Sequence, residues 1–251
     1  MLKEKDIQYF DNGLNSINKL WYRINQISNG LEPVLFHGKT ILELGCGHGR
    51  LSIEMAKEQT TKVVGIDLNE TLISFAKENL QENFVELEKR LEFKLENICN
   101  LDSEQFDIVV SKDTFEHIIE LEKVINCIYR VLKPGGKCYI GFGPLYYSHN
   151  GEHSKTLAPF KWGHALLSDR FMINYYNKKN PLNKIESIYD LGLNKLKLKD
   201  YKEIFKRSDF EVVYFKSNVS EHWIGKMQNL LSYIPFLKEY FSFNIYCVLK
   251  K

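Results

Sequence analysis

The sequence predicts an α/β fold in which helices cover both faces of a mostly parallel sheet. From Lys39 to about Gly143, short apolar segments that suit strands alternate with segments of helical spacing. Repeated β–α units of this length imply parallel strands joined by right-handed crossovers. The apolar segments lack strict polar–apolar alternation, which is typical of strands that are buried on both faces.

Each expected element has its own signal in the chain. Apolar or β-branched runs indicate strands, and apolar residues three and four apart indicate helices. In chain order, strands are expected at Thr40–Leu44, Lys62–Ile66, Leu91–Leu95, Phe106–Ser111 and Lys137–Phe142, and helices at Leu51–Glu58, Leu72–Leu80 and Leu121–Leu132. Residues 134–136, Pro-Gly-Gly, are expected to break the last helix before the fifth strand. A helix at Leu198–Ser208 and strands at Phe210–Lys216 and Phe243–Leu249 complete the prediction.

Two regions fall outside the alternation. Residues 1–37 have helical character and carry several aromatic side chains, so we expect a helical N-terminal cap. Residues 144–196 show no clear period, and we expect an insertion after the fifth strand that binds substrate. No internal repeat or linker divides the chain. We therefore expect one domain over 1–251, with its core at 38–143 and its last strands in 197–251.

Composition narrows the classes of function. The 251 residues carry 34 basic and 32 acidic side chains, a net charge of +2, which argues against an extended nucleic-acid-binding face. No apolar run approaches the roughly 20 residues needed to span a bilayer, and the start lacks a signal-peptide pattern. The five cysteines are scattered and show no CxxC spacing. We expect a reduced, cytoplasmic protein without membrane insertion or structural zinc.

A glycine-rich turn follows the first expected strand. Gly45, Gly47 and Gly49 let the backbone turn tightly and approach a ligand closely. Asp67 ends the next strand, where a carboxylate can accept hydrogen bonds from both hydroxyls of a ribose. In an open parallel sheet, ligands bind beyond the carboxyl ends of such strands. On its own this turn also suits a dinucleotide site, although the dinucleotide fingerprint spaces its glycines as G-x-G-x-x-G.

The turn, with Glu43 two residues before Gly45, resembles the first motif of the class I S-adenosylmethionine-dependent methyltransferases, an acid followed by G-x-G-x-G. Three later segments resemble this family in the same order: VVGIDLN at 63–69, FDIVVSKDTFEHI at 106–118 and VLKPGGKCYIGF at 131–142. The resemblance covers roughly residues 39–143. It implies a Rossmann-like sheet of seven strands and S-adenosylmethionine as the cofactor.

The resemblance also implies roles for individual residues. The turn around Gly45, Cys46 and Gly47 is expected to face the methionine part of the cofactor. Glu43 is expected to organise this turn or reach the cofactor's amino group through water, and Asp67 to hold the ribose. The adenine is expected to contact Leu68, Asn97 and Ile98, with Asn97 standing where the family often has an acid. Lys112 is expected near the methionine end.

Side chains for acid–base chemistry gather after the fourth and fifth strands. His117 follows the fourth strand, and Glu116 is expected to orient it or to contact substrate. The catalytic candidates are His117, His149, His153 and His164. The substrate-binding candidates are Tyr9, Trp21, Glu116, Tyr146 and Tyr147. No metal is expected, because these histidines lack a compact zinc spacing and no acidic cluster accompanies them.

The acceptor is expected to be a small polar molecule methylated on nitrogen or oxygen. The chain lacks the D/N-P-P-Y turn of methyltransferases that act on exocyclic amines of nucleic-acid bases. The pattern GEH followed by WGHALLSD resembles methyltransferases of bacterial surface-polysaccharide pathways, which favours a sugar, a sugar nucleotide or a phosphorylated amine. A protein or RNA methyltransferase, a nicotinamide-dependent oxidoreductase and a non-catalytic cofactor-binding regulator stay open, as does a monomer or a homodimer.

Overall fold

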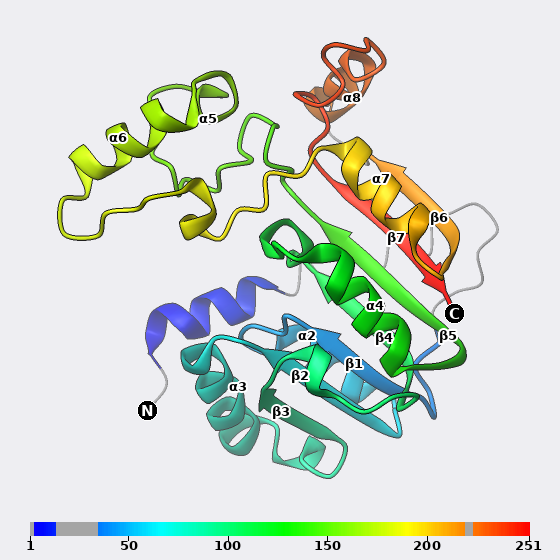
Figure 1. Ribbon diagram of the computed structural model, residues 1–251. Helices are drawn as coiled ribbons and strands as arrows, with labels where there is room; N and C mark the ends of the chain where they lie inside the picture. Colours follow the sequence, from blue (N-terminus) through cyan, green and yellow to red (C-terminus); the bar gives the residue numbers. More distant parts are fainter. Residues whose placement is uncertain (1–2, 14–34, 219–222) are drawn as a thin grey trace.

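One seven-stranded sheet forms the centre of the molecule, in the order β3-β2-β1-β4-β5-β7-β6 (Figure 1). The computed structural model describes residues 3–13, 35–218 and 223–251. The strands are β1 (Thr40–Leu44), β2 (Lys62–Asp67), β3 (Leu91–Leu95), β4 (Phe106–Lys112), β5 (Leu132–Phe142), β6 (Glu211–Ser217) and β7 (Ile245–Lys250). Strands β1 to β5 run parallel, and β7 is antiparallel to both of its neighbours. The predicted fold class is confirmed.

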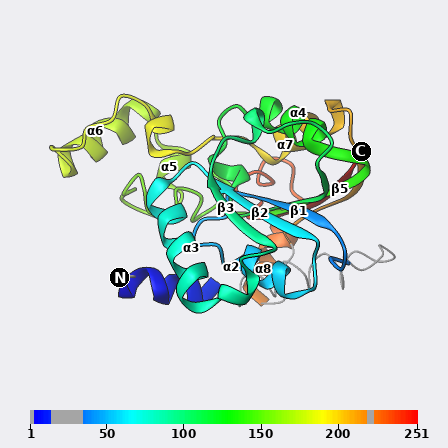
Figure 2. The same ribbon diagram turned by 90° about the horizontal axis from the view of Figure 1, so that it is seen from below.

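Helices cover both faces of this sheet. The longer ones are α2 (Arg50–Lys57), α3 (Glu70–Asn83), α4 (Leu121–Val131) and α7 (Leu198–Arg207), and short 3-10 helices are η1 (Val85–Leu87), η2 (Ile98–Asn100) and η3 (Phe115–His117). Residues 4–13 are also helical. The insertion after β5 carries α5 (Gly163–Leu166), α6 (Asp169–Lys179) and η4 (Ile188–Leu191). It extends away from the sheet in both views (Figures 1 and 2).

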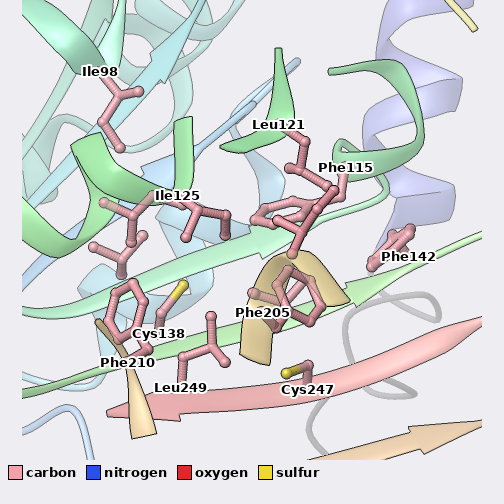
Figure 3. Close-up of a cluster of buried hydrophobic side chains, with 14 of the residues drawn as sticks. Ile98, Phe115, Leu121, Ile125, Cys138, Phe142, Phe205, Phe210, Cys247 and Leu249 are labelled. Atoms are coloured by element: carbon pink, nitrogen blue, oxygen red, sulfur yellow. The ribbon is translucent and has the colours of Figure 1, made fainter. Parts of the chain in front are cut away.

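Alternation of side chains along the strands builds a separate core on each face. In β1, Ile41 packs in the cluster that contains Phe75 of α3, whereas its neighbour Leu42 packs in the cluster that contains Phe205 of α7. Successive side chains of a strand point to opposite faces, so both neighbours are fully buried. Figure 3 shows part of the second cluster, in which Phe115 and Phe205 lie between α4, α7 and the sheet. The two cores hold the carboxyl ends of β1, β2 and β4 in fixed positions.

The strand order reverses beside β1. The chain runs from β1 through β2 to β3 in one direction and continues from β4 on the other side of β1. The chain therefore continues from β1 to α2 on one face of the sheet and from β4 to α4 on the other, which leaves a crevice at the carboxyl ends of these strands. The glycine-rich turn follows β1 and borders this crevice.

The structure differs from the predicted elements in two places. Pro134 and the two glycines after it lie inside β5, which begins at Leu132 directly after α4. The register between β4 and β5 shifts there, and Gly135 has φ of 77°, so the segment forms an irregularity within the strand. Near the C-terminus, α8 (Trp223–Leu231) precedes β7, in a stretch between two predicted strands for which no element was predicted.

The expectation that every cysteine is reduced is wrong for two of the five. Cys99 at η2 and Cys127 on α4 form a disulfide, with their Cα atoms 5.1 Å apart. They are separated by 28 positions in sequence, and only the packing of α4 beside η2 brings them together. Cys46, Cys138 and Cys247 are free and buried. In the described part of the chain, no helix is long and apolar enough to cross a membrane.

Candidate functional site

The glycine-rich turn after β1 is shaped by three positive φ angles. Gly45, Gly47 and Gly49 have φ of 75°, 51° and 81°, a region that favours glycine. The amide of Gly45 donates to the carbonyl of Ile66 at 2.9 Å, which ties the turn to β2. A Cβ on Gly45 would lie 2.3 Å from Oγ1 of Thr114, whereas one on Gly47 would meet no atom within 4 Å. The turn is thus packed on one side and open on the other.

A cavity of about 940 Å³ lies on the open side of this turn. Its walls come from the ends of β1, β2 and β4, from residues 96–98 and 117–120, and from the N-terminal helix. The predicted cofactor residues all line it: Glu43, Gly45, Cys46, Gly47, Asp67, Leu68, Asn97, Ile98 and Lys112. The structure therefore brings this whole set to one cavity at the switch point of the sheet.

Asp67 is fixed at the end of β2 by two backbone amides. Its Oδ2 accepts a hydrogen bond from the amide of Gly47 at 2.9 Å, and its Oδ1 accepts one from the amide of Asn69 at 2.9 Å. Each carboxylate oxygen has two lone pairs, so each can accept one more bond from a ligand. The carboxylate is thus oriented before a ligand arrives and keeps capacity for a pair of hydroxyls.

Glu43 is a buried carboxyl at the floor of the cavity. It is 3% exposed, and the hydroxyl of Ser52 on α2 donates to its Oε2. Burial raises the pKa of the Glu43 carboxyl to about 8, against the lowering effect of the Ser52 hydrogen bonds. A buried carboxyl of this kind becomes ionised when a cation is placed beside it. Glu43 therefore fits a ligand that carries an ammonium group.

The far end of the cavity presents apolar and amide groups. Leu68 is 72% exposed, and Ile98 is buried behind it in the wall. Asn97 Oδ1 accepts a hydrogen bond from the amide of Cys99 at 2.9 Å, so it caps η2. Its amide oxygen has one lone pair left for a ligand. The neighbouring Glu96 lines the same wall, and a hydrogen bond from Asn100 lowers its pKa.

The N-terminal helix closes one side of the cavity against the glycine-rich turn. The ring of Tyr9 lies 4.8 Å from that of His48, and Nε2 of His48 lies 3.3 Å from Oδ1 of Asp6. Tyr9 lines the cavity and is 69% exposed. The other aromatic residue predicted in this cap, Trp21, lies outside the described residues.

His117, which lines the cavity, meets His153 of the insertion, whereas His153 and Glu116 do not themselves line the cavity. The rings of the two histidines lie 5.0 Å apart, although 36 positions separate them in sequence. His117 lines the cavity next to Lys112, which is paired with Asp113. Desolvation by burial lowers the pKa of both imidazoles. Glu116, His117 and His153 each offer one ligand atom, and these three atoms lie within 4.8 Å of one another.

The other predicted residues of the insertion lie elsewhere. Tyr146 and His164 are 4% and 2% exposed, and Nε2 of His164 lies 2.7 Å from the carbonyl oxygen of Tyr146. Tyr147 packs edge-on against Tyr146, and His149 packs on Trp162 with ring centres 5.5 Å apart. Within the described parts of the chain, none of these four predicted residues lines the cavity. Their roles in catalysis or substrate binding stay predictions.

Sequence reasoning missed the residues that support this site. Thr114 fills the space beside Gly45, and Ser52 donates to Glu43. Ser52 had a signal in the sequence, because a polar residue inside the apolar pattern of a buried helix needs a partner. Thr114 had none, since its contact with Gly45 depends on how the loop after β4 folds over β1.

Comparison with known proteins places similarity to methyltransferases mainly in the first part of the chain. Residues 35–157 match a family model described as a methyltransferase domain. Ubiquinone biosynthesis O-methyltransferase of Pseudomonas entomophila (strain L48) is 37% identical over 126 residues, 50% of this chain and 51% of that protein. Phosphoethanolamine N-methyltransferase 2 of Caenorhabditis elegans is 33% identical over 121 residues, 47% of this chain and 27% of that protein. The chain spans about half the length of the first of these relatives and less of the second.

The fold is similar to solved structures over nearly its whole length. Phosphoethanolamine N-methyltransferase 2 of Haemonchus contortus, solved with phosphomonomethylethanolamine and S-adenosylhomocysteine, matches with a TM-score of 0.61. The match covers 95% of this chain and 53% of that one, at 19% identity. At this identity the likeness concerns the fold.

Proposed function

Because residues 35–157 form a class I S-adenosylmethionine-dependent methyltransferase domain, we propose that the chain transfers a methyl group to nitrogen or oxygen of a small polar metabolite. One observation carries this proposal. A single cavity joins a turn with open glycine backbone, the oriented carboxylate of Asp67 and the imidazole of His117. A cofactor site and an acceptor site are thus continuous, as methyl transfer requires.

Each end of the cavity suits one part of S-adenosylmethionine. Asp67 has lone pairs for the ribose hydroxyls, and the exposed Leu68 with Ile98 and Asn97 suits the adenine. The buried carboxyl of Glu43 suits the ammonium group of the methionine part, which lies against Gly45, Cys46 and Gly47. The cationic Lys112 suits its carboxylate. These roles rest on the fit of the residues to the chemistry of the cofactor.

The bound cofactor supplies a methyl group already activated by its sulfonium. The chain's own task is to align the acceptor with that methyl group and to keep water out, which can lower the barrier by several kcal/mol. His117 lies at the cavity wall with a lowered pKa, so its imidazole is neutral near pH 7 and can accept a proton from the acceptor. Glu116 and His153 lie beside it without lining the cavity, and their roles toward the acceptor are part of the proposal.

The proposed acceptor is a sugar, a sugar nucleotide or a phosphorylated amine of a surface-polysaccharide pathway. The support is the pattern GEH followed by WGHALLSD in the insertion and the basic residues Lys155, Lys161 and Arg170 around it. Two relatives named for small-molecule methylation, one on oxygen and one on nitrogen, favour the same size class and leave the acceptor atom open. The proposed setting is the cytoplasm, where a disulfide such as that of Cys99 with Cys127 is unusual, and the chain is proposed to act as a monomer or a homodimer.

Competing functions make different demands on the same cavity. A nicotinamide-dependent oxidoreductase needs room for a dinucleotide and usually spaces its glycines as G-x-G-x-x-G, which this turn does not. A regulator that only binds the cofactor needs Glu43 and Asp67 but no base at His117. A protein or RNA methyltransferase needs an open, extended acceptor surface, whereas His117 stands at the wall of a cavity.

The test is methyl transfer from labelled S-adenosylmethionine to a panel of sugars, sugar nucleotides and phosphorylated amines. We expect label in at least one small acceptor and none in protein or RNA. His117→Ala should lower turnover and leave the affinity for S-adenosylhomocysteine unchanged. Cofactor binding with no transfer to any acceptor would favour the regulator, and label in RNA or protein would overturn the proposed acceptor class.

A further inference from the structure

Three potential metal ligands meet beside the acceptor end of the cavity. Glu116 and His117 lie on η3 after β4, and His153 lies in the insertion after β5. Their ligand atoms lie within 4.8 Å of one another, a separation that one ion can bridge. The histidines come from segments far apart in sequence, which is why their spacing gave no metal motif.

Glu116 lacks a partner that its position demands. It is 3% exposed, and its Oε1 accepts one hydrogen bond, at 3.3 Å, from the amide of Gly143. Its Oε2 is buried without a hydrogen-bond partner among the described residues. A buried carboxyl oxygen with no donor is costly, and native proteins normally satisfy such groups. A cation at this oxygen supplies the missing interaction.

Both histidines already hold the tautomer that a metal needs. Nδ1 of His117 lies 2.7 Å from the carbonyl oxygen of Gly192, and Nε2 of His153 lies 3.1 Å from that of Pro144. A carbonyl oxygen only accepts, so each of these nitrogens carries the hydrogen. The lone pairs are left on Nε2 of His117 and Nδ1 of His153. Metal-binding histidines are oriented in this way, with the second nitrogen donating to a carbonyl or carboxylate.

We propose that Glu116, His117 and His153 bind one divalent transition-metal ion. Two imidazole nitrogens and one carboxylate oxygen suit Zn²⁺, Co²⁺ or Fe²⁺ better than Mg²⁺ or Ca²⁺, which prefer oxygen ligands. Three protein ligands leave at least one position open. His117 also lines the cavity, so the ion would lie beside the space proposed for the acceptor, and it would take the Nε2 lone pair that serves as the base in the metal-free chain. Resting on the proposed function, this favours an acceptor with an oxygen donor, such as a hydroxyl or a diol.

The experiment uses the full chain after a chelator has removed bound metal, and titrates it with Co²⁺ in the absence of cofactor. Visible absorption of the bound Co²⁺ reports the ligand geometry, and a separate calorimetric titration with Zn²⁺ gives the stoichiometry. We expect one equivalent per chain, and an affinity at least tenfold lower in Glu116→Gln and in His153→Ala. His149→Ala is the matched control, since it removes a histidine from the same insertion outside the cluster, and its affinity should equal that of the wild type.

Two results would overturn the site: no equimolar binding of Co²⁺ by the wild-type chain, or equal affinity in His153→Ala, Glu116→Gln and His149→Ala. Binding of S-adenosylhomocysteine to each variant, without metal, checks that the fold is intact. It also separates the two proposals. Loss of cofactor binding with Co²⁺ binding retained contradicts the proposed function alone, and the reverse contradicts the metal site alone.

Discussion

The two halves of the cavity, which we assign to the cofactor and to the acceptor, are built on different principles. The proposed cofactor half rests on β1, β2 and the turns that follow them, and neighbouring segments of the parallel sheet hold each of its groups. The proposed acceptor half is lined by His117 and the residues that follow it, and the insertion lies beside this wall, where His153 packs against His117. Local sequence therefore determines the first half, whereas contacts between distant segments determine the second.

The largest expected effect concerns the glycine-rich turn of the cofactor half. Gly45→Ala places a Cβ 2.3 Å from Thr114 and keeps φ at 75°, and overpacking with backbone strain is expected to cost about 3 kcal/mol of unfolding free energy. Gly47→Ala meets no protein atom and is expected to cost about 1 kcal/mol from strain alone. Denaturant unfolding measures both. Equal losses of unfolding free energy in the two variants would contradict this account of the turn. So would a Gly45→Ala loss that is no smaller when it is combined with Thr114→Ala.

The next prediction compares two histidines of the insertion, His164 and His149, that lie outside the cavity. His164 is buried against Tyr146, and His164→Ala is expected to lower stability by about 2 kcal/mol by leaving the carbonyl of Tyr146 unpaired. His149→Ala, at a half-buried position, should cost less than half as much. Thermal unfolding gives the comparison. A stable His164→Ala protein that binds cofactor and has lost turnover would instead make His164 catalytic.

The pH dependence of stability links the two halves, because the buried carboxyl of Glu43 lines the cofactor half and the buried carboxyl of Glu116 lies beside the acceptor half. The pKa values of Glu43 and Glu116 are both raised to about 8 by burial, above the value of an unfolded chain. Their contributions are full below about pH 4.5 and are lost as the pH rises through 8. The lowered pKa values of His117, His149, His153 and His164, of which only His164 is fully buried, act in the opposite direction, but only below about pH 6.5. Between pH 6.5 and 8 the carboxyls alone remain.

In that window, each carboxyl is expected to remove about 1.5 kcal/mol of unfolding free energy from the ligand-free chain. Glu43→Gln and Glu116→Gln should each reduce the decrease of the unfolding free energy between pH 6.5 and pH 8, since an amide does not titrate. Chemical denaturation at the two pH values measures this decrease. Stability that is constant across this window would show that the two carboxyls are already ionised in the folded chain.

The smallest expected effect is on cofactor affinity. Asp67→Ala is expected to weaken binding of S-adenosylhomocysteine at least tenfold, about 1.4 kcal/mol, because it removes both acceptors offered to the ribose. Asp102→Ala, at an exposed acid outside the cavity, is the control. Calorimetry compares the two. An unchanged affinity in Asp67→Ala would remove Asp67 from the ribose role.

The same contrast explains what the sequence could predict. Apolar periodicity predicted β1 and β3 to the residue, because these short strands end at glycines or polar residues that stop the pattern. The residues predicted to hold the cofactor line one cavity, since Gly45 and Asp67 lie at strand ends whose positions the topology fixes, and their binding role stays a prediction. The Pro-Gly-Gly segment was placed outside the fifth strand because local rules do not reveal an irregularity that neighbouring strands hold in place.

Pairs of residues from distant segments escaped prediction. The meeting of His117 with His153 and the disulfide of Cys99 with Cys127 both depend on how separate elements pack. Of the four candidate histidines, two form one cluster, and nothing in their spacing distinguished them from His149 and His164. Local sequence pattern can predict which residue types a proposed acceptor site contains, but it cannot predict which individual histidines come together in the fold.

Calorimetric titration of the ligand-free chain with S-adenosylhomocysteine and, separately, with NAD tests the central claim most directly. The cavity beside Gly47, Glu43 and Asp67 predicts stoichiometric binding of S-adenosylhomocysteine, and binding at least tenfold weaker in Asp67→Ala. It predicts no comparable binding of NAD. Binding of NAD without binding of S-adenosylhomocysteine would contradict the assignment of this cavity to a methyl donor.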